Sequence, residues 1–153
     1  AKALANLTQL KGRGALHTLN LANGDVRIID ESYNANDTSM RASLRVLAKQ
    51  KGRKIAVLGD MLELGPDSIK IHMELINALD DIDLVFACGP LMKHLYDALP
   101  TIKKGAHCET ADQLAPFVCQ SIQAGDTLSI KSSRGSRTDL VLEALLTLNT
   151  HGN

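Results

Sequence analysis

The sequence is poor in aromatic residues and has no excess of charge of either sign. Tryptophan is absent, and Phe and Tyr make up only 3% of the 153 residues. A core of small and aliphatic side chains suits helices packed on a parallel sheet better than an aromatic-rich β-sandwich. Lys and Arg together number 17, as do Asp and Glu, so no global field attracts the chain to nucleic acid or to an anionic membrane. We therefore expect no nucleic-acid partner.

Cysteine, histidine and long apolar runs are also scarce or unpatterned. The three cysteines include no C-x-x-C pair, which favours buried thiols in a reducing compartment. No signal peptide and no run of membrane-spanning length is present, so we expect a cytoplasmic protein without membrane insertion. The histidines lack metal-ligand spacing, and we expect surface or hydrogen-bonded side chains and no metal site. These histidines are His17, His72, His94, His107 and His151.

The beginning of the chain differs from the rest. Residues 1–10 have the pattern of a short helix, and Lys11-Gly12-Arg13-Gly14 is a basic, flexible break. We expect residues 1–14 to be a tail and linker, and residues 15–153 to be one domain, of a length that buries most of a core.

Strand and helix patterns alternate through the domain. Residues 16–21 and 26–30 flank Asn23-Gly24, a hairpin signal that makes the first β element antiparallel. Buried parallel strands are expected at residues 54–59, 84–89, 106–108 and 127–130. The apolar stripes that predict the helices are Met40, Leu44, Leu47 and Ala48; Ile69, Met73, Ile76 and Leu79; Leu91, Leu95 and Leu99; Leu114, Phe117, Val118 and Ile122; and Val141, Ala144, Leu145 and Leu148. The alternation predicts an α/β fold with a doubly wound, mainly parallel, Rossmann-like sheet.

Polar residues gather where the predicted strands end. Ligands of such sheets bind beyond the carboxyl ends of the strands. Residues 30–36 offer carboxylate and amide groups suited to ribose hydroxyls or a purine edge, and residues 131–137 offer cations and hydroxyls suited to a carboxylate or phosphate. Residues 59–65 and Gly89-Pro90 form two further exits. Polar clusters from both ends of the domain thus converge on one edge of the sheet. This convergence favours a ligand site.

Helix capping is an alternative explanation for these polar residues. Asn36 or Asp37 would cap the helix that follows, and the serines near Arg134 would cap the last helix. Known catalytic patterns are missing as well. No G-x-G-x-x-G follows a strand, no G-x-S-x-G is present, and Ile130 occupies the position before Lys131-Ser132 where a phosphate-binding loop requires glycine. We therefore expect no catalytic residue and no complete catalytic apparatus within this chain.

Three ordered motifs resemble the C-terminal domain of the Mur ligases. They are Asp30-Glu31-Ser32-Tyr33-Asn34-Ala35-Asn36 with Ser39-Met40, then Val57-Leu58-Gly59-Asp60-Met61-Leu62-Glu63-Leu64-Gly65 followed by His72, then Lys131-Ser132-Ser133-Arg134. Together they cover about 140 residues of the chain, which makes them far more specific than a lone glycine pattern. Lys11–Gly14 resembles the junction between the central and C-terminal domains of this family, so residues 1–12 would be the tail of the central ATPase domain.

The resemblance implies an ATP-dependent peptide ligase of peptidoglycan precursor synthesis. Its substrates would be D-alanyl-D-alanine and UDP-N-acetylmuramoyl-tripeptide. ATP and Mg²⁺ would be held mainly by the missing central domain, which carries the phosphate-binding loop in this family. The present domain would close over the nucleotide and orient the dipeptide amine, so this chain alone would be inactive. Its other partners would be the N-terminal and central domains of the same protein.

The resemblance also implies roles for particular residues. The nucleotide would be bordered by Asp30, Ser32, Tyr33 and Asn34. The amine substrate would meet Asn36, Asp60, Glu63, Leu64, Lys131, Ser133 and Arg134. In this interpretation the last three residues receive the dipeptide carboxylate, a task for which a guanidinium and a hydroxyl are well suited.

The chain departs from the family pattern at four places. Glu31 stands where the family usually has Asp, Asp37 replaces a common Pro, Ser132 replaces a Gly, and Thr138-Asp139 replaces a common Met-Glu. The Ser132 change bears on how closely the backbone at that turn can approach a neighbour.

Two other interpretations are left open. One is a free-standing α/β module that binds a nucleotide or small anion without catalysis. The other is a Mur-type ligase with a different amino-acid substrate, although Tyr33-Asn34-Ala35-Asn36 departs from the D-Y-x-H pattern of those sister enzymes.

Overall fold

The computed structural model describes residues 14–149, so the helix expected at residues 1–10 and most of the expected linker lie outside the described residues. A six-stranded sheet in the order β1-β2-β6-β3-β4-β5 forms the centre of the domain. β1 is antiparallel to β2, and all other neighbours are parallel. The predicted α/β fold and its antiparallel first strand are therefore confirmed.

The regular elements follow the predicted alternation. The strands are β1 (Ala15–Leu21), β2 (Gly24–Glu31), β3 (Lys54–Gly59), β4 (Leu84–Cys88), β5 (Lys104–Cys108) and β6 (Thr127–Lys131). The α-helices are α2 (Asp37–Ala48), α3 (Ser68–Glu74), α4 (Pro90–Ala98), α5 (Ala111–Ser121) and α6 (Asp139–Leu146). Short 3₁₀ turns are η1 (Gly65–Asp67), η2 (Leu75–Leu79), η3 (Thr101–Lys103) and η4 (Arg134–Ser136). No helix among residues 14–149 reaches the length and hydropathy that a membrane span requires.

Local sequence signals explain the hairpin turn between β1 and β2 and the start of α2. Leu21 pairs with Gly24, so the hairpin turn consists of Ala22 and Asn23, one residue earlier than the Asn23-Gly24 signal suggested. Asn36 is the N-cap of α2, where its side chain accepts the Ser39 N–H at 2.8 Å and Ser39 Oγ accepts the Asn36 N–H at 3.0 Å. The capping alternative for Asn36 is thus confirmed, with a reciprocal capping box.

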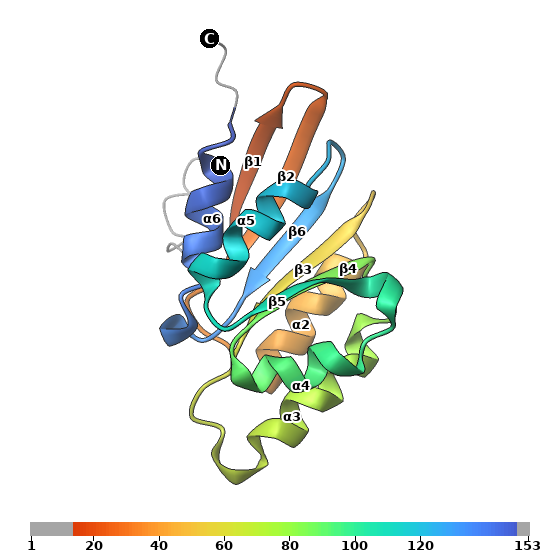
Figure 1. Cartoon of the computed structure of the whole chain (residues 1–153). Coiled ribbons are helices and arrows are strands. Elements are labelled where there is room, and N and C mark those ends of the chain that lie inside the picture. Colours follow the sequence, from red (N-terminus) through yellow and green to blue (C-terminus); the bar gives the residue numbers. More distant parts are fainter. Residues whose placement is uncertain (1–13, 150–153) are drawn as a thin grey trace, which may run out of the picture.

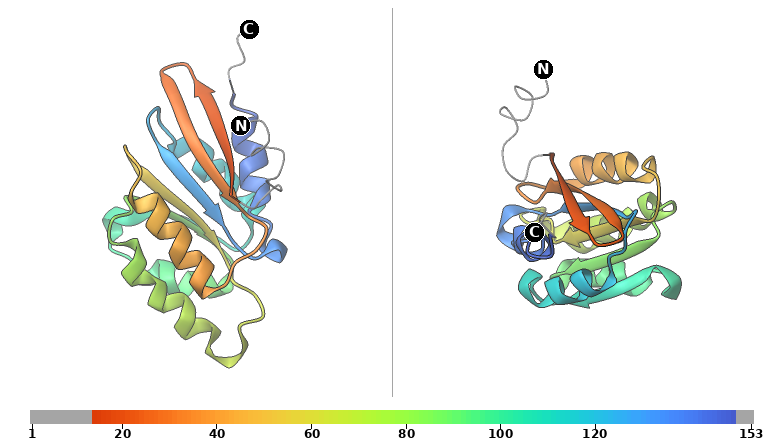
Figure 2. Two further views of the ribbon diagram at one scale, coloured as in Figure 1. Left: turned by 180° about the vertical axis from the view of Figure 1, so that it is seen from behind. Right: turned by 90° about the horizontal axis from the view of Figure 1, so that it is seen from above.

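Helices cover both faces of the sheet (Figures 1 and 2), and an apolar cluster fills the space on each side. On one face, α5 and α6 pack over a cluster that includes Val57, Ile130 and Leu145. On the other face, α2, α3 and α4 cover a cluster that includes Leu44 and Leu58. This arrangement of helices on both faces is what makes the sheet doubly wound.

The predicted helix stripes were wrong at four positions. Ile69, Met73, Phe117 and Leu148 are between 37% and 49% exposed. Because the helix after β3 changes from α to 3₁₀ at Leu75, its buried side is set by His72, Leu75 and Leu79. In α5 the buried set has the spacing i, i+3, i+4, i+7 and excludes Phe117, while Leu148 lies beyond the end of α6.

The order of the strands determines where a ligand site can form. The helices after β2, β3 and β4 lie on one face of the sheet, whereas α5 and α6 lie on the other. β6 is inserted between β2 and β3. The connections therefore leave toward opposite faces at the carboxyl ends of these three neighbouring strands, which is the switch point where open α/β sheets bind ligands.

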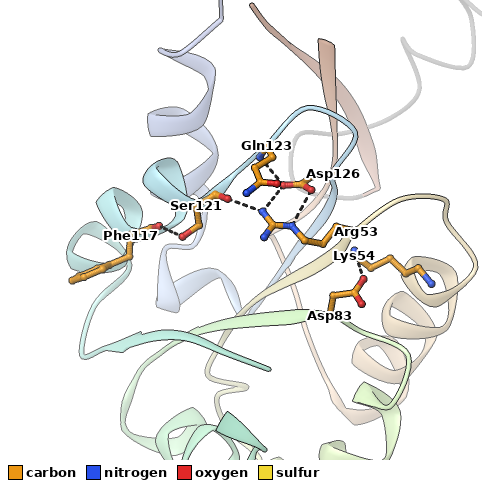
Figure 3. Close-up of polar contacts among 7 residues, drawn as sticks. All are labelled: Arg53, Lys54, Asp83, Phe117, Ser121, Gln123 and Asp126. Atoms are coloured by element: carbon orange, nitrogen blue, oxygen red, sulfur yellow. Dashed lines mark hydrogen bonds and ion pairs between the residues drawn. The ribbon is translucent and has the colours of Figure 1, made fainter. Parts of the chain in front are cut away.

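The opposite end of the sheet is closed by a polar network around Arg53 and Asp126 (Figure 3). Arg53 Nε and Nη2 donate to the two carboxylate oxygens of Asp126 at 3.0 and 2.8 Å, and Nη2 also donates to the Ser121 carbonyl at 2.6 Å. Asp126 also accepts the Gln123 N–H at 2.7 Å and has a side chain only 3% exposed. The hydrogen bond that Arg53 donates to Asp126 raises the pKa of Arg53. This network ties the beginnings of β3 and β6 to the end of α5.

Substituting Asp126→Ala should lower the free energy of unfolding by about 2–3 kcal/mol, because the guanidinium and the Gln123 N–H lose a shared buried acceptor. Urea unfolding followed by circular dichroism measures the effect. The control is Asp97→Ala, which removes the exposed Lys93–Asp97 pair and should cost less than about 0.5 kcal/mol. Equal losses in the two variants would contradict a stabilising role for the network.

Candidate functional site at the carboxyl edge of the sheet

Asp60, directly after β3, joins the exits of three strands. Its carboxylate accepts the N–H groups of Leu91 and Met92, at 3.1 and 2.7 Å, in the first turn of α4. A carboxylate stabilises a helix N-terminus both by these bonds and through the helix dipole. Its backbone carbonyl accepts from Ser133 N at 3.2 Å and from Ser136 Oγ at 2.9 Å, in the segment after β6.

Gly89 makes this contact possible. A Cβ on Gly89 would lie 2.4 Å from the Asp60 carboxylate, and its φ of +102° is one that other residues rarely adopt. The Gly89-Pro90 exit therefore serves to let the Asp60 carboxylate reach the α4 N-terminus. Since both oxygens of Asp60 are used in this way, the structure gives this residue a structural task and leaves its predicted contact with the amine substrate untested.

The serines after β6 join loops rather than cap α6. Ser133 Oγ accepts the Leu62 N–H at 2.8 Å and donates to the Ala35 carbonyl at 3.4 Å, which brings the exits of β2, β3 and β6 together. The N-cap of α6 is Thr138, without a side-chain capping bond. The capping alternative for the serines near Arg134 is therefore wrong, and the predicted convergence of the exits on one edge is confirmed.

His72 fixes the loop that follows β3. The residue is fully buried, and its Nδ1 lies 2.6 Å from the Ser68 carbonyl while its Nε2 accepts the Met61 N–H at 2.9 Å. A carbonyl can only accept and an N–H can only donate, so these partners require a neutral ring protonated at Nδ1. The expectation of surface or hydrogen-bonded histidines holds for His72, whereas the partly buried His17 has an Nε2 with no hydrogen-bond partner among the described residues.

Asp30 and Ser32 form a local turn at the end of β2. Asp30 is fully buried, and its Oδ1 accepts from Ser32 N at 3.1 Å and Ser32 Oγ at 2.7 Å. The second oxygen, Oδ2, is buried without a hydrogen-bond partner among the described residues. Asp30 lies on the same face of β2 as Val26 and Ile28, which pack under α5 and α6, so it faces away from the groove between the β1–β2 hairpin and α2.

Tyr33 and Arg134 meet at a second cavity, of about 390 Å³. The Arg134 guanidinium lies 5.3 Å from the centre of the Tyr33 ring, a cation–π contact that holds the side chain without neutralising its charge. Ser32, Arg137 and Asp139 complete the lining. Arg137 donates to both oxygens of Asp139 at 2.9 and 3.0 Å, and this hydrogen bonding raises the pKa of Arg137. The cavity therefore offers two guanidinium groups and one carboxylate. Because Asp139 already pairs with Arg137, Arg134 is the group of this lining best suited to a ligand carboxylate.

A groove of about 600 Å³ lies between the β1–β2 hairpin and α2. Its apolar walls include Leu16, Ile29 and Val46, and its polar end includes Glu31 and Ser43. Leu16 is 72% and Val46 is 52% exposed. A flat apolar group with polar donors at one end matches this lining.

Lys131 lies close to the polar end of this groove rather than to Arg134. Its side chain is 6% exposed, and its Nζ is 3.7 Å from Glu31 Oε1. The predicted group of Lys131, Ser133 and Arg134 is therefore not one cluster. Lys131 faces the α2 side with Glu31, Ser133 joins the loops, and Arg134 borders the second cavity.

The remaining predicted residues are not drawn into a common cluster. Asn34 and Glu63 are exposed, Leu64 packs against the apolar cluster on the α2 face, and Asn36 is engaged in capping. Among residues 14–149, no group of three or more His, Cys, Asp or Glu side chains could hold a metal ion.

Sequence reasoning missed Ser43, which lines the groove. Ser43 did carry a signal, because it is a polar residue on the apolar stripe of α2 beside Met40, Leu44 and Leu47. Glu31, Ser136 and Arg137 were included in the polar strand exits but were given no role of their own. The position of Arg137 follows from the left-handed turn at the end of η4, which the sequence did not indicate.

A third cavity, of about 400 Å³, lies between Asp60 and the start of α5 and includes Cys88 in its lining. Cys88 is buried, whereas Cys108 and Cys119 are only partly buried, so the prediction of buried thiols holds fully for Cys88 alone. Burial raises the pKa of Cys88 to about 12. The thiol is therefore a packing group and not a nucleophile.

Comparison with known proteins agrees with this architecture. The model of the family "Mur ligase, glutamate ligase domain" matches residues 12–134. The UDP-N-acetylmuramoyl-tripeptide–D-alanyl-D-alanine ligase of Rickettsia prowazekii is 32% identical over 146 residues, which is 94% of this chain and 32% of that protein. The enzyme of the same name from Escherichia coli is 32% identical over 148 residues, 93% of this chain and 31% of that protein.

Solved structures give the same result. The MurF ligase from Thermotoga maritima in complex with ADP superposes with a TM-score of 0.78 and 28% identity, over 95% of this chain and 33% of that one. One structure of MurF from Acinetobacter baumannii superposes with a TM-score of 0.76 and 30% identity, over 92% of this chain and 31% of that one. The chain belongs to the Mur ligase family, as the glutamate ligase domain. It spans about a third of the length of these relatives.

Substituting His72→Ala should lower the free energy of unfolding by about 3 kcal/mol, because the Met61 N–H loses its acceptor and a buried cavity is created. Urea unfolding measures the loss. The control is His94→Ala, at an exposed position of α4, which should stay within about 0.5 kcal/mol of the parent. A His72→Ala loss no larger than that of the control would show that the ring does not fix the loop.

The Cys88 thiol should resist iodoacetamide at pH 8 in the folded chain and react once the chain is unfolded in urea, since only the thiolate reacts. Because the pKa of Cys88 in the folded protein is raised to about 12, its contribution to stability is complete below about pH 8.5 and is lost as the pH rises toward 12. Peptide mass spectrometry measures the labelling. Equal labelling rates in native and unfolded protein at pH 8 would contradict this assignment.

Proposed function

We propose that this chain is the part of an ATP-dependent ligase that closes over the nucleotide and positions the amine substrate. The whole enzyme would join D-alanyl-D-alanine to UDP-N-acetylmuramoyl-tripeptide, the activity given in the names of the relatives from R. prowazekii and E. coli. The observation that carries the proposal is the convergence of the β2, β3 and β6 exits on one edge through Asp60 and Ser133. Residues 1–14 would belong to the end of the preceding ATPase domain and its linker, and residues 15–153 to this domain, within a cytoplasmic protein.

The nucleotide fits the groove beside Glu31. Apolar walls from the hairpin and α2 accommodate the base, and the carboxylate of Glu31 accepts from ribose hydroxyls. Of the residues that the resemblance assigned to the nucleotide, Tyr33 and Asn34 remain near this edge, whereas Asp30 and Ser32 form the buried turn beneath it. The relative from T. maritima was crystallised with ADP, which supports a nucleotide partner.

The dipeptide carboxylate fits the cavity between Arg134 and Arg137. Tyr33 holds Arg134 by its ring, so the guanidinium keeps its charge and its donors for a ligand. Asp60, Glu63 and Leu64 would act on the dipeptide indirectly, by shaping the loop after β3, and Asn36 by capping α2. Closure over both ligands would exclude water and align the dipeptide amine with the peptide carboxyl group.

ATP supplies the phosphoryl group that activates the peptide carboxylate in the whole ligase. In residues 14–149 the candidate edge offers cations and hydroxyls but no cluster of metal ligands, so the preceding domain would bind Mg²⁺ and the phosphates. This assignment of Mg²⁺ and the phosphates to the preceding domain distinguishes the proposed ligase domain from a free-standing binding module. If it is correct, adding the preceding domain to this chain produces ATP turnover that depends on both substrates.

A titration with D-alanyl-D-alanine, followed by amide chemical shifts, tests the site. Shifts should cluster at residues 131–137 and 60–65, and Arg134→Ala should weaken binding by about 10- to 100-fold, the equivalent of one charge-assisted hydrogen bond pair. Arg45→Ala, at an exposed position of α2, is the matched control and should leave the affinity unchanged. Shifts that persist in Arg134→Ala would show that the carboxylate binds elsewhere.

A further inference from the structure

Glu31, Lys131 and Ser43 form a compact cluster contributed by three elements. Glu31 ends β2, Lys131 ends β6, and Ser43 lies in the second turn of α2. Glu31 and Lys131 are register partners in adjacent parallel strands. Successive side chains of a strand alternate between faces, so both lie on the face that α2 covers. Ser43 approaches them from that helix.

Each oxygen of the Glu31 carboxylate has its own partner. Ser43 Oγ donates to Oε2, and Lys131 Nζ lies 3.7 Å from Oε1. A carboxylate has about four lone-pair positions, so these two contacts fix its plane and leave acceptor positions unused. Glu31 and Ser43 both line the groove, and Glu31 keeps 25% of its side chain exposed.

A gain in folding stability does not explain why these three residues are placed together. Lys131 is nearly buried, and its Nζ is too far from Glu31 for a hydrogen bond of ordinary length. Burial lowers the pKa of Lys131, and the charge of Glu31 opposes that shift. Among the described residues, Glu31 is the charged group that acts on Lys131. Replacing a buried ion pair by apolar side chains of similar size is often neutral or stabilising, so the pair needs another reason.

We propose that Ser43 and Lys131 are positioning residues that hold the Glu31 carboxylate between them and present it, in one orientation, to the hydroxyl donors of a nucleoside in the groove. This rests on the proposed function, which places a nucleotide there. Ser43 fixes the carboxylate from the helix side, and Lys131 fixes it from the neighbouring strand. The side chain of Glu31 spans the distance from the end of β2 to α2, where the Ser43 hydroxyl meets its carboxylate.

Binding of ADP to the chain tests the functional half of the proposal. Glu31→Gln and Ser43→Ala should weaken ADP binding, by about 10-fold and about 3- to 10-fold, respectively, as expected for hydrogen bonds to a charged group. Ser43→Thr keeps the hydroxyl and should restore the affinity. The matched control is Ser121→Ala, which removes one hydroxyl bond to the Phe117 carbonyl at the far end of the sheet and should leave ADP binding unchanged.

Titration of Lys131 tests the cluster without any ligand. In protein labelled with ¹³C at the lysine ε-carbons, the Lys131 signal is identified by its loss in Lys131→Met. Glu31→Gln should lower the pKa of Lys131, because the one charged partner of Lys131 among the described residues disappears. Ser43→Ala should lower this pKa less, because Glu31 is then free to turn away. Ser43→Thr and Ser121→Ala should leave it unchanged. A loss of stability alone would not produce this pattern.

The two measurements fail in different ways. A Lys131 pKa that is the same in the parent and in Glu31→Gln overturns the cluster, whatever the chain binds. If the pKa pattern holds but the parent chain and all variants bind ADP with equal affinity, the positioning role is overturned while the proposed function stands. If the parent does not bind ADP at all, the proposed function fails for the isolated chain, and the ligand role of the cluster fails with it.

Discussion

The candidate site depends on the carboxylate of Asp60 at the N-terminus of α4. This one side chain uses both oxygens to cap a helix, while its own carbonyl receives two donors from the segment after β6. Three strand exits that are far apart in sequence thereby share one anchor. Two glycines near Asp60 leave room for these close contacts. Gly89 has no side chain to obstruct the carboxylate, and Gly59 lies so close to Ser132 that a Cβ there would be 2.7 Å from the Ser132 Cβ.

Around this anchor the edge divides into two chemically different regions. The α2 side carries an apolar groove that ends in an oriented carboxylate, while the α6 side carries two guanidinium groups beside an aromatic ring. The first region suits a neutral ligand part with hydroxyl donors, and the second suits an anion. Because β6 separates the two regions, one rigid strand can hold two ligands in a fixed relation.

The fold was largely predictable from the sequence, because apolar runs and helical stripes are local signals. The Asn23-Gly24 signal, the buried strand at residues 54–59 and the capping residue Asn36 each act within a few positions, and each is confirmed apart from a shift of one residue in the turn. The misassigned face of Ile69 arises where a helix changes to 3₁₀, and Phe117 was misassigned because it lies outside the regular buried spacing of α5.

The site was less predictable because its contacts join distant positions. The convergence of the strand exits followed from topology, yet the partner of each side chain did not. Lys131 and Arg134 are three positions apart in sequence and serve opposite faces, since the strand ends between them. Asp60 looked like a ligand contact in its motif, and only the three-dimensional position of α4 shows that it caps a helix.

The antiparallel direction of β1 determines where the chain enters the domain. Ala15 pairs with Asp30, and the Gly14 N–H donates to the Asp30 carbonyl at 2.8 Å, so the entry point lies beside the end of β2 and not at the far pole. A parallel first strand of this length would have placed it about 20 Å away. A rotation of the domain about Gly14 would therefore have a short lever arm at the end of β2 and a longer one at the exit of β4, which lies four strands from β1. The same rotation would move the Arg53 end of the sheet, at the opposite ends of the strands, while the end of β2 changes mainly in orientation.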